Sequence, residues 1–541
     1  MPSRLDDSPS LVRVAHALAC VPALFLLVDA LFRWTLGPSL LAEGALTVAL
    51  YAAALRLYPI GRENLSRPII ALSALFLAAI YIVSASLYDT SWDGTSYHLP
   101  AVLALAQGWN PVASAAPVEP QNFNPNGIWT AEALLFRLIG SIEGAKAMNG
   151  VLLLAAFLAL LAAVRAMLAR PLRRLELATV AATAGNPVAL AQLFTFYVDG
   201  ALYEAGLLCL AALMLAGSPQ RRAALGLLAA SIVLMTGAKL TAAFFALALP
   251  AVALAALWRR TPGKPAVAAI AVATFAVATL AVGFRPYVTN VRDHGQLVVE
   301  RWGDDVDRPR ALAALSPPML LLWGVFGRTA GLDDATSLKS PVSVAPHEVL
   351  AMATPDPRIG GFGPLFAAET VLAAAVLVLA FVLARGRAPP GAALFVLALL
   401  IVATCAIFPE PWWARLVPFL WTAPLFAALG GAAGSSRAVR LLAAGVVMLA
   451  VLNGAMAFGG NLARDVLGDL RTRALMQTLK STNQEIVLVP AMARGFELTD
   501  GYRLRQWGVP FRVAAPNLSP ALSPDCGRLL KLERLAYCLP H

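Results

Sequence analysis

The chain has 541 residues, of which 59% are hydrophobic and 13% charged, and its mean hydropathy is +0.71. A water-soluble domain of this size could not carry so many apolar side chains on its surface. The net charge of +11 comes from Arg and Lys residues spread among short loops rather than gathered in one basic domain. The composition therefore predicts a membrane protein and excludes a nucleic-acid-binding protein.

About thirteen apolar segments are predicted to cross a membrane as helices, because a bilayer core of about 30 Å needs about 20 helical residues. They lie near 11–34, 38–57, 68–87, 146–168, 175–194, 198–217, 222–236, 239–258, 265–284, 364–384, 390–408, 415–433 and 438–458. The first has no cleavage site after it and is expected to be retained. Basic residues fall in alternate loops, which predicts a cytoplasmic N-terminus and a periplasmic C-terminus at the inner membrane of a bacterium.

Three segments on the predicted outer side are long enough to fold: 88–145, 285–363 and 459–541. The first contains two predicted interfacial helices, at 98–107 and 128–139. The last contains a predicted helix at 462–480 followed by a strand at 486–490. The expected division is an N-terminal hairpin at 1–67, a transmembrane module at 68–458 and a C-terminal α/β domain at 459–541. The overall fold class is an all-α polytopic membrane protein.

The five cysteines separate into two groups. Cys20, Cys209 and Cys405 lie within predicted spans and are expected to be apolar packing residues. Cys526 and Cys538 both lie in the outer C-terminal segment, and an even pair in an oxidising compartment predicts a disulfide.

The richest polar stretch is YDTSWDGTSYH at the start of the first outer segment, directly after a predicted span. It places two carboxylates, Asp89 and Asp93, among the aromatic residues Trp92, Tyr97 and His98. Carboxylates of this kind can take a proton from a hydroxyl group, and aromatic rings can stack on sugars. The alternative is that these residues cap a helix and form an interfacial aromatic belt.

A second set of ionisable residues lies at or near the outer ends of other spans. Asp199 begins a span, Glu204 lies about one turn deeper, and Lys239 interrupts an apolar stretch. Charge inside a membrane is costly and marks candidate functional residues, although helix capping explains Asp199 and snorkelling explains Lys239 equally simply.

Further cations follow in the second outer segment and before a late span, and they are candidates for binding a phosphate group. They are Arg285, Arg292, His294, Lys339, Arg358 and Arg415. Lys239, Arg285 and Arg415 lie at span ends and are predicted to hold a lipid phosphate. Arg415, in PEPWWAR, has an interfacial anchor as its alternative role.

With these acids, and with the stretches NPNGIWTAEALLF, GNPVALAQLFTFYVDG and GFRPYVTN, the chain resembles the type-C (GT-C) membrane glycosyltransferases. That family includes protein O-mannosyltransferases and lipid A aminoarabinose transferases. The resemblance covers roughly residues 68–460 and implies transfer of a sugar from a polyprenyl-phosphate donor, with an acid of the first outer loop as the catalytic base. Family members often have adjacent acids, or acids one residue apart, whereas Asp89 and Asp93 are four positions apart.

The predicted function is therefore transfer of a sugar to a cell-envelope glycan, lipid or protein on the periplasmic face. Asp93 is the preferred base and Asp89 the next, because Trp92, Gly94 and Tyr97 surround Asp93 with a site suited to a sugar. A divalent cation, Mg²⁺ or Mn²⁺, is a possible cofactor, although no dense group of carboxylates indicates one. The alternatives are an O-antigen polymerase or ligase and a lipid or polysaccharide transporter or flippase.

Overall fold

The computed structural model describes residues 8–57, 66–298, 308–309, 312–331, 337–385, 388–389, 391–434, 436–490, 495–514, 528–532 and 535–539. Its elements through the first half of the chain are α1 (Ser8–Thr35), α2 (Leu40–Leu57), α3 (Arg67–Ser86), η1 (Gly94–His98), α4 (Leu99–Ala106), η2 (Glu119–Phe123), α5 (Gly127–Ile139), η3 (Glu143–Lys146), α6 (Ala147–Leu168), α7 (Arg174–Ala184), α8 (Pro187–Ala191), α9 (Asp199–Leu215), α10 (Arg221–Ala238), α11 (Ala242–Ala256) and α12 (Lys264–Leu280). The remainder are η4 (Phe284–Val288), α13 (Thr289–His294), α14 (Pro317–Phe326), α15 (Pro346–Ala351), α16 (Phe366–Leu383), α17 (Ala392–Ile407), η6 (Pro418–Trp421), α18 (Thr422–Ala433), α19 (Arg437–Ser481), β1 (Ile486–Pro490), α20 (Phe496–Trp507), β2 (Phe511–Val513), β3 (Arg528–Leu532) and β4 (Leu535–Leu539).

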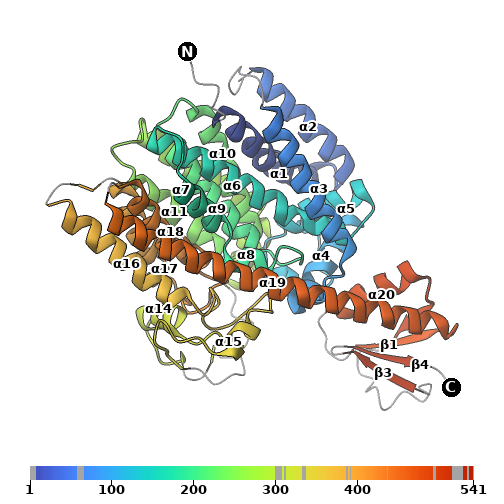
Figure 1. The fold of residues 1–541 in the computed structure, drawn as a ribbon. Helices are drawn as coiled ribbons and strands as arrows, with labels where there is room; N and C mark the ends of the chain where they lie inside the picture. Colours follow the sequence, from blue (N-terminus) through green and yellow to red (C-terminus); the bar gives the residue numbers. More distant parts are fainter. Residues whose placement is uncertain are drawn as a thin grey trace.

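The protein is a multi-pass membrane protein built from one helical bundle (Figure 1). Within the described residues, six helices are long and apolar enough to cross a membrane, or seven if α12 and the segment 284–294, which are bent by 86° to each other, form one span. Several other predicted spans are shorter apolar helices, such as α11 and α17. The sequence-based number of thirteen spans is therefore not confirmed.

Two predicted boundaries differ from the structure. The span expected at 175–194 is two helices, α7 and α8, because the chain leaves the helix at Gly185 and Asn186 and Pro187 begins the next one. Conversely, the span at 438–458 and the outer helix at 462–480 are one continuous helix, α19 (Figure 1). The bundle and the C-terminal domain thus share a helix.

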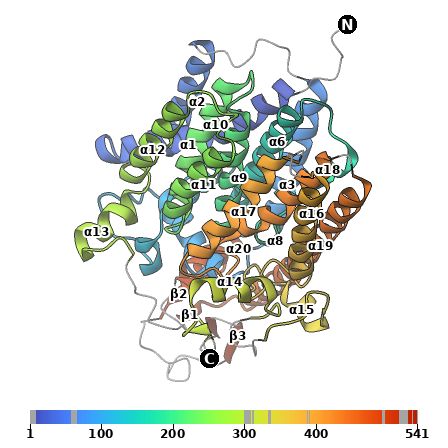
Figure 2. The same ribbon diagram turned by 90° about the vertical axis from the view of Figure 1, so that its left-hand side faces the viewer.

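Helix α9 lies in the middle of the bundle (Figure 2). All 17 of its residues are buried, and it packs against α6, α10 and α11. A helix that is apolar all round is expected in such a position. Two glycines permit close approach, since a Cβ on Gly200 would lie 3.1 Å from the Ala189 Cα and a Cβ on Gly206 only 2.1 Å from the Phe419 ring. The first residue of this buried helix is Asp199.

The C-terminal domain contains the predicted strand at 486–490, which is β1 of a four-stranded sheet. The strand order is β2-β1-β4-β3, with β1 parallel to β2 and antiparallel to β4. Helix α20 and the end of α19 cover the sheet through a core that includes Met476, Leu488 and Tyr537. The register pairs Leu529 with Cys538, and Cys526, the other cysteine of the predicted disulfide, lies outside the described residues.

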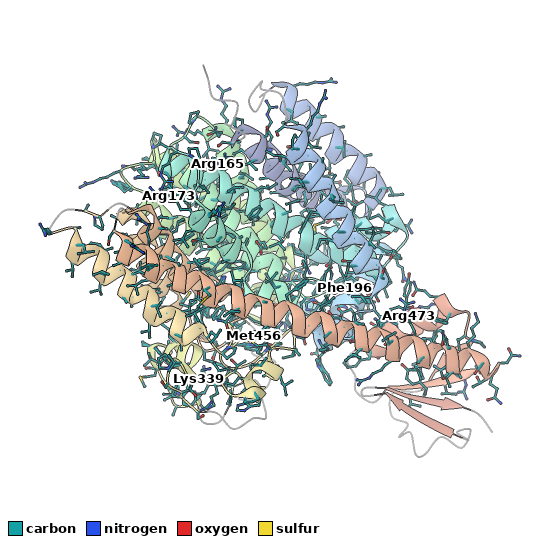
Figure 3. The ribbon with its side chains drawn as sticks, viewed as in Figure 1. Arg165, Arg173, Phe196, Lys339, Met456 and Arg473 are labelled. Carbon is teal, nitrogen blue, oxygen red and sulfur yellow. The ribbon has the colours of Figure 1, made fainter. Side chains whose placement is uncertain are left out.

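Residues of the predicted inner loops and of the second outer segment lie at opposite ends of the bundle (Figure 3). Arg165 and Arg173, in loops predicted to be cytoplasmic, lie at one end, and Lys339 of the second outer segment lies at the other. Both predicted helices of the first outer segment are present, as α4 and α5. The second outer segment contains an apolar helix, α14, that the sequence analysis did not predict.

Candidate active site

The first outer loop leaves α3 at Ser86 and turns into the short helix η1, which Asp93 precedes. Gly94 is required at the start of η1, because a Cβ there would lie 2.1 Å from the Asp89 Oδ2 and 2.2 Å from the Ser91 Oγ. The backbone N–H of Asp93 donates to the Tyr197 hydroxyl oxygen at 3.2 Å. The loop is therefore packed directly onto the segment that leads into α9.

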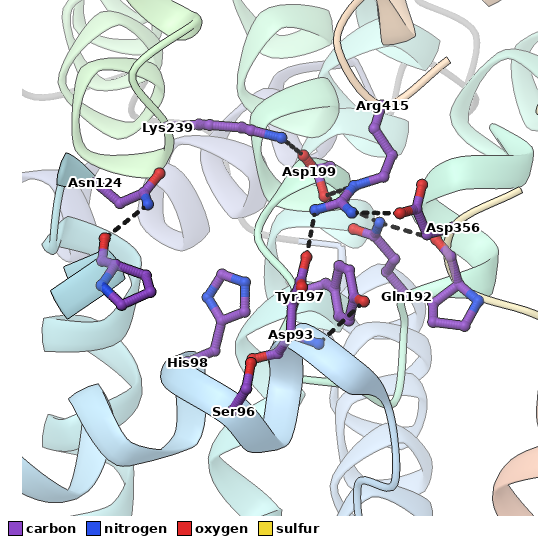
Figure 4. Close-up of polar contacts among 12 residues, drawn as sticks. Asp93, Ser96, His98, Asn124, Gln192, Tyr197, Asp199, Lys239, Asp356 and Arg415 are labelled. Atoms are coloured by element: carbon purple, nitrogen blue, oxygen red, sulfur yellow. Dashed lines mark hydrogen bonds and ion pairs between the residues drawn. The ribbon is translucent and has the colours of Figure 1, made fainter. Parts of the chain in front are cut away.

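Arg415 is the centre of the polar site (Figure 4). Its guanidinium donates from three nitrogens to three carboxylates: Nη2 to Asp93 Oδ2 at 3.0 Å, Nε to Asp199 Oδ2 at 2.7 Å and Nη1 to Asp356 Oδ2 at 2.7 Å. The Arg415 side chain is 6% exposed. Burial lowers the pKa of Arg415, but the three carboxylates outweigh burial and raise that pKa well above its usual value. Arg415 therefore stays charged.

Asp199 is the most enclosed of the three carboxylates, with no exposed side-chain surface. Its Oδ1 accepts from Lys239 Nζ at 2.5 Å, and its Oδ2 also accepts from Gln192 Nε2 at 3.1 Å. Gln192 is held in turn, because its Oε1 accepts from the Gly200 N–H at 2.9 Å. Lys239 and Arg415, two predicted phosphate ligands, are thus brought together on one carboxylate.

Asp356 lies beside an aromatic wall. Its Oδ1 accepts from the Trp413 indole N–H at 2.7 Å, and its Oδ2 pairs with Arg358 Nε at 3.2 Å. The guanidinium of Arg358 stacks 4.1 Å from the centre of the Trp413 ring. The guanidinium of Arg415 lies 4.7 Å from the centre of the Tyr197 ring and 5.4 Å from that of Trp413. Cation–π contacts of this kind fix the planes of both guanidinium groups.

Asp93 is the most accessible carboxylate in the cluster. Its side chain is 21% exposed, compared with 11% for Asp356 and none for Asp199. Arg415 donates to one of its oxygens. A reactant that enters this site can therefore reach Asp93 before the other two acids.

His98 lies on the inner side of the same loop and is 2% exposed. Its Nδ1 accepts from the Trp129 indole N–H at 2.7 Å, which assigns the proton of a neutral ring to Nε2. Burial lowers the pKa of His98 well below its usual value, so the ring is neutral at physiological pH. Nε2 has no hydrogen-bond partner within the described part of the chain.

Tyr97 and Trp92, two aromatic residues predicted to bind a sugar, pack against other side chains of the protein. Tyr97 stacks 4.2 Å from the His98 ring and is 9% exposed, and Trp92 meets the ring of Phe496 edge-on at 5.2 Å. Both residues make protein contacts that hold the loop together. A role in binding a sugar stays a prediction.

Asp89 has a different environment from Asp93. It is fully buried, and its two oxygens accept from the backbone N–H groups of Ser91 and Phe196, each at 2.8 Å. The carboxylate therefore joins the first outer loop to the segment before α9. This geometry favours a role for Asp89 in holding the loop and leaves Asp93 as the acid that faces the site.

We expect Asp89→Asn to destabilise the fold, because an amide can accept from one of these N–H groups but turns its own NH₂ toward the other. Leaving a buried donor without a partner costs about 1–3 kcal/mol of unfolding free energy. Thermal unfolding of the purified protein in detergent would measure the loss. An unchanged melting temperature together with lost activity would instead make Asp89 a catalytic residue.

The remaining predicted cations lie in separate places. Arg285 donates to the Pro111 carbonyl at 2.9 Å and to Asn122 Oδ1, and Arg292 is exposed and pairs with Asp293. His294 lies near the ring of Phe123. Lys339 donates to Glu348 at 2.5 Å and to the Pro364 carbonyl at 2.8 Å. None of these contacts joins the Arg415 cluster.

Glu204 is buried within α9, and neither of its carboxyl oxygens has a hydrogen-bond partner among the residues that the structure describes. It lies five positions after Asp199 in the same helix. No contact connects Glu204 with Arg415 or Lys239, so its predicted role in binding stays a prediction.

Sequence reasoning missed four members of the cluster as site residues: Asp356, Gln192, Tyr197 and Trp413. Gln192 lies at the end of the predicted span 175–194, and Tyr197 lies in the short gap before the next predicted span. The signal that could have found them is the density of polar and aromatic residues in QLFTFYVD and PWWAR, next to acids and bases already selected. Asp356 is one acid among several in the second outer segment, and its partner is 59 positions away.

Chemically, the cluster offers at one place a partly accessible carboxylate, the buried cation Arg415 and the partly buried cation Lys239. A carboxylate can take a proton, and cations can hold an anion. A metal site is a separate question: within the described ranges, no group of three His, Cys, Asp or Glu side chains is arranged to hold an ion. The three carboxylates converge on Arg415 instead.

The chain was compared with known proteins. No family model and no curated protein matches it. Among solved structures, it is similar to ArnT from Cupriavidus metallidurans in the apo state, with 13% sequence identity, a TM-score of 0.45, and coverage of 83% of this chain and 86% of that one. A second structure, of the same ArnT bound to undecaprenyl phosphate, gives 14% identity, a TM-score of 0.44 and coverage of 84% and 87%.

Proposed function

We propose that the protein is a glycosyltransferase that moves a sugar from a polyprenyl-phosphate donor to a cell-envelope acceptor on the periplasmic face. The observation that carries this proposal is the cluster in which Asp93, Asp199 and Asp356 share Arg415, with Lys239 beside it. One site thus combines a partly exposed acid with the buried cation Arg415 and the partly buried cation Lys239. Transfer from a lipid phosphate needs a base for the acceptor and positive charge for the leaving phosphate.

In the proposed reaction, Asp93 takes the proton of an acceptor hydroxyl group. The hydroxyl oxygen forms a bond to the anomeric carbon of the donor sugar, and the bond between that carbon and the phosphate oxygen breaks. The electron pair of the broken bond leaves with the polyprenyl phosphate. The increase in negative charge on the phosphate is offset by Arg415 and Lys239, whose low exposure makes their charges act more strongly than they would in water.

Arg415 already has three partners, so a phosphate group has to share or replace one of them. Asp199 is the least replaceable, because it is fully buried and also bonded to Lys239 and Gln192. The bond from Arg415 Nη2 to Asp93 is the longest of the three, and Asp93 is the most exposed acid. We infer that a donor phosphate takes the place of Asp93 on Arg415. This exchange would release Asp93 to accept a proton.

The test uses purified protein in detergent with undecaprenyl-phosphate-linked glucose, mannose or 4-amino-4-deoxyarabinose, and envelope glycolipids as acceptors. Release of undecaprenyl phosphate that depends on acceptor, with the sugar recovered on the acceptor by mass spectrometry, supports the proposal. If undecaprenyl phosphate sugars are moved across proteoliposome membranes without cleavage, the protein is a flippase. Activity with undecaprenyl-diphosphate oligosaccharides alone would indicate a polymerase or ligase.

We expect Lys239→Met to weaken binding of undecaprenyl phosphate about 10- to 100-fold, the effect of losing one charge-assisted bond. The fold should persist, because Asp199 keeps its bonds from Arg415 and Gln192. Binding can be measured by native mass spectrometry or by titration in detergent. Lys264→Met is the matched control, since Lys264 stacks over the Trp258 ring away from the site.

The same titration decides the role of Arg285. The position of Arg285 at a span end predicts that it binds phosphate together with Lys239 and Arg415. In the structure its guanidinium donates to Pro111 and Asn122 instead. If Arg285→Met weakens undecaprenyl phosphate binding as much as Lys239→Met does, the donor recruits Arg285. Wild-type affinity in both variants would contradict a phosphate site at Lys239.

A further inference from the structure

The segment that leads from α3 to Asp93 has almost no regular secondary structure, and charged side chains bond its backbone groups. Besides Arg464, which donates to the Thr90 carbonyl at 3.4 Å, three cations donate to its carbonyl oxygens, and two carboxylates from other elements accept from its N–H groups. The pairs are Arg473 with Ser86 O at 2.8 Å, Lys146 with Leu87 O at 2.5 Å, Arg503 with Asp89 O at 2.6 Å, Tyr88 N with Asp469 at 3.0 Å and Asp89 N with Glu143 at 3.0 Å. Charge-assisted bonds are stronger than neutral ones, so the path of this backbone is closely determined.

The partners come from three distant elements. Glu143 and Lys146 belong to η3, Asp469 and Arg473 to α19, and Arg503 to α20 of the C-terminal domain. Figure 1 shows α20 beside the C-terminal part of α19, and α20 packs against η1 and α4 of the first outer segment. The C-terminal domain thus contacts the loop that carries Asp93.

Arg503 bonds both to the backbone of this segment and to Glu143. Its side chain is 5% exposed, and its Nη2 donates both to the Asp89 carbonyl and to Glu143 Oε1, the latter at 3.1 Å. The other oxygen of Glu143 accepts from the Asp89 N–H. Both backbone polar groups of Asp89 are therefore held by one ion pair between η3 and α20.

A second set of contacts lies close to Asp93, one just before it in the sequence at Trp92 and one just after it at Thr95. Thr499 Oγ1 donates to the Thr95 carbonyl at 2.7 Å, and the Phe496 ring packs edge-on against Trp92. Phe496, Thr499 and Arg503 are spaced three and four residues apart, so they share one face of α20. Arg505, two positions after Arg503, is exposed and stacks on Phe511 within its own domain.

We propose that α20 is part of the active site's framework and that Arg503 is a positioning residue for Asp93. The inference rests on the proposed function for its kinetic part. The contacts of α20 at Asp89, Trp92 and Thr95 lie on both sides of Asp93, which leaves that residue little freedom to move. A displacement of about 1 Å in a reacting group can cost about 100-fold in rate. The C-terminal domain thereby determines the geometry of the loop that carries Asp93.

The first test is hydrogen–deuterium exchange of the full-length protein in detergent, which requires no substrate. In Arg503→Met, amides at 88–98 should exchange at least about tenfold faster than in the wild type, because the Asp89 carbonyl and Glu143 lose a partner. Amides in α9 and α18 should be unchanged. Arg505→Met is the matched control, with the same substitution on the exposed face of the same helix.

The second test is kinetic and uses the undecaprenyl-phosphate sugar that the wild type accepts. Arg503→Met should lower kcat about 10- to 100-fold with little change in donor KM, since Arg503 touches the loop and not the donor site. Thr499→Val, which keeps the shape and loses one bond, should shift exchange and kcat in the same direction by less. If Arg503→Met does not fold, Arg503→Lys and Thr499→Val carry both measurements.

The outcomes separate the two proposals. Faster exchange at 88–98 in a protein that transfers no sugar would support the positioning role and reject the glycosyltransferase. Unchanged exchange at 88–98 in Arg503→Met would overturn the positioning role, whatever the activity. Equal losses of kcat in Arg503→Met and Arg505→Met would also overturn it, because the effect would then belong to the domain's stability and not to the contact with the loop.

Discussion

Asp93→Asn is expected to lower the rate of sugar transfer by about 10²- to 10⁴-fold, the usual contribution of a general base. The amide keeps the size of the carboxylate and an oxygen that can accept from Arg415 Nη2. It cannot take a proton from an acceptor hydroxyl group. Steady-state transfer with saturating donor and acceptor measures the change. The melting temperature should stay close to that of the wild type, and undecaprenyl phosphate should bind at least as tightly, because a neutral amide competes less with the phosphate for Arg415.

The matched control for this prediction is Asp293→Asn. Asp293 is an exposed acid of the second outer segment whose bond is to its neighbour Arg292. Its substitution should leave transfer unchanged. Near-normal turnover in Asp93→Asn would remove Asp93 from the mechanism, and a larger loss in a stably folded Asp89→Asn would assign the base to Asp89.

Arg415→Met is expected to be the most destabilising single change in the cluster. It removes the cation that three carboxylates share, and Asp199 and Asp356 are buried or nearly so. Removing one partner of a buried ion pair costs about 3–5 kcal/mol, because the charge left behind has neither its partner nor water. The melting temperature in detergent should fall strongly, and transfer should be lost with it.

Second-site variants test the cause of that loss. Asp356→Asn added to Arg415→Met removes one of the three negative charges that Arg415 balanced and should restore part of the lost stability without restoring transfer. Arg358→Met, which removes the neighbouring cation–π partner of Trp413, is the comparison. If Asp356→Asn further destabilises Arg415→Met, repulsion among the carboxylates is not the cause, and Arg415 stabilises the fold through packing.

Several features of the fold could be predicted from the sequence because they depend on local signals. Hydropathy identified the long apolar helices such as α1, α6 and α16, and the short strand-like run IVLVP identified β1. The number of spans was not predicted reliably. α7 and α8 are separated at Gly185 and Asn186, inside a run whose average hydropathy does not reveal the break.

Candidate site residues could also be predicted from the sequence where a charged residue lies next to a predicted span. Asp93, Asp199, Lys239 and Arg415 were selected for this reason, and the structure joins all four in one cluster. Asp356 was not selected, because an acid in a long loop has no local feature that distinguishes it. Arg503 also lacks a distinguishing local feature, since nothing near it in the sequence indicates a contact with Asp89.

The sequence by itself determined that this is a helical membrane protein with its polar residues gathered near the ends of particular spans, because hydropathy and the cost of charge in lipid depend on residues close together in the chain. The tertiary structure alone decided which of those residues meet. Arg415 reaches Asp93 across 322 positions, and Arg503 reaches Asp89 across 414. Asp89 and Asp93 look alike in YDTSWDG, but one oxygen of Asp89 meets the Phe196 N–H while Asp93 faces Arg415 and the open side of the cluster. The environment of an acid is set by groups that the fold brings from elsewhere, and these groups leave no trace in the neighbouring sequence.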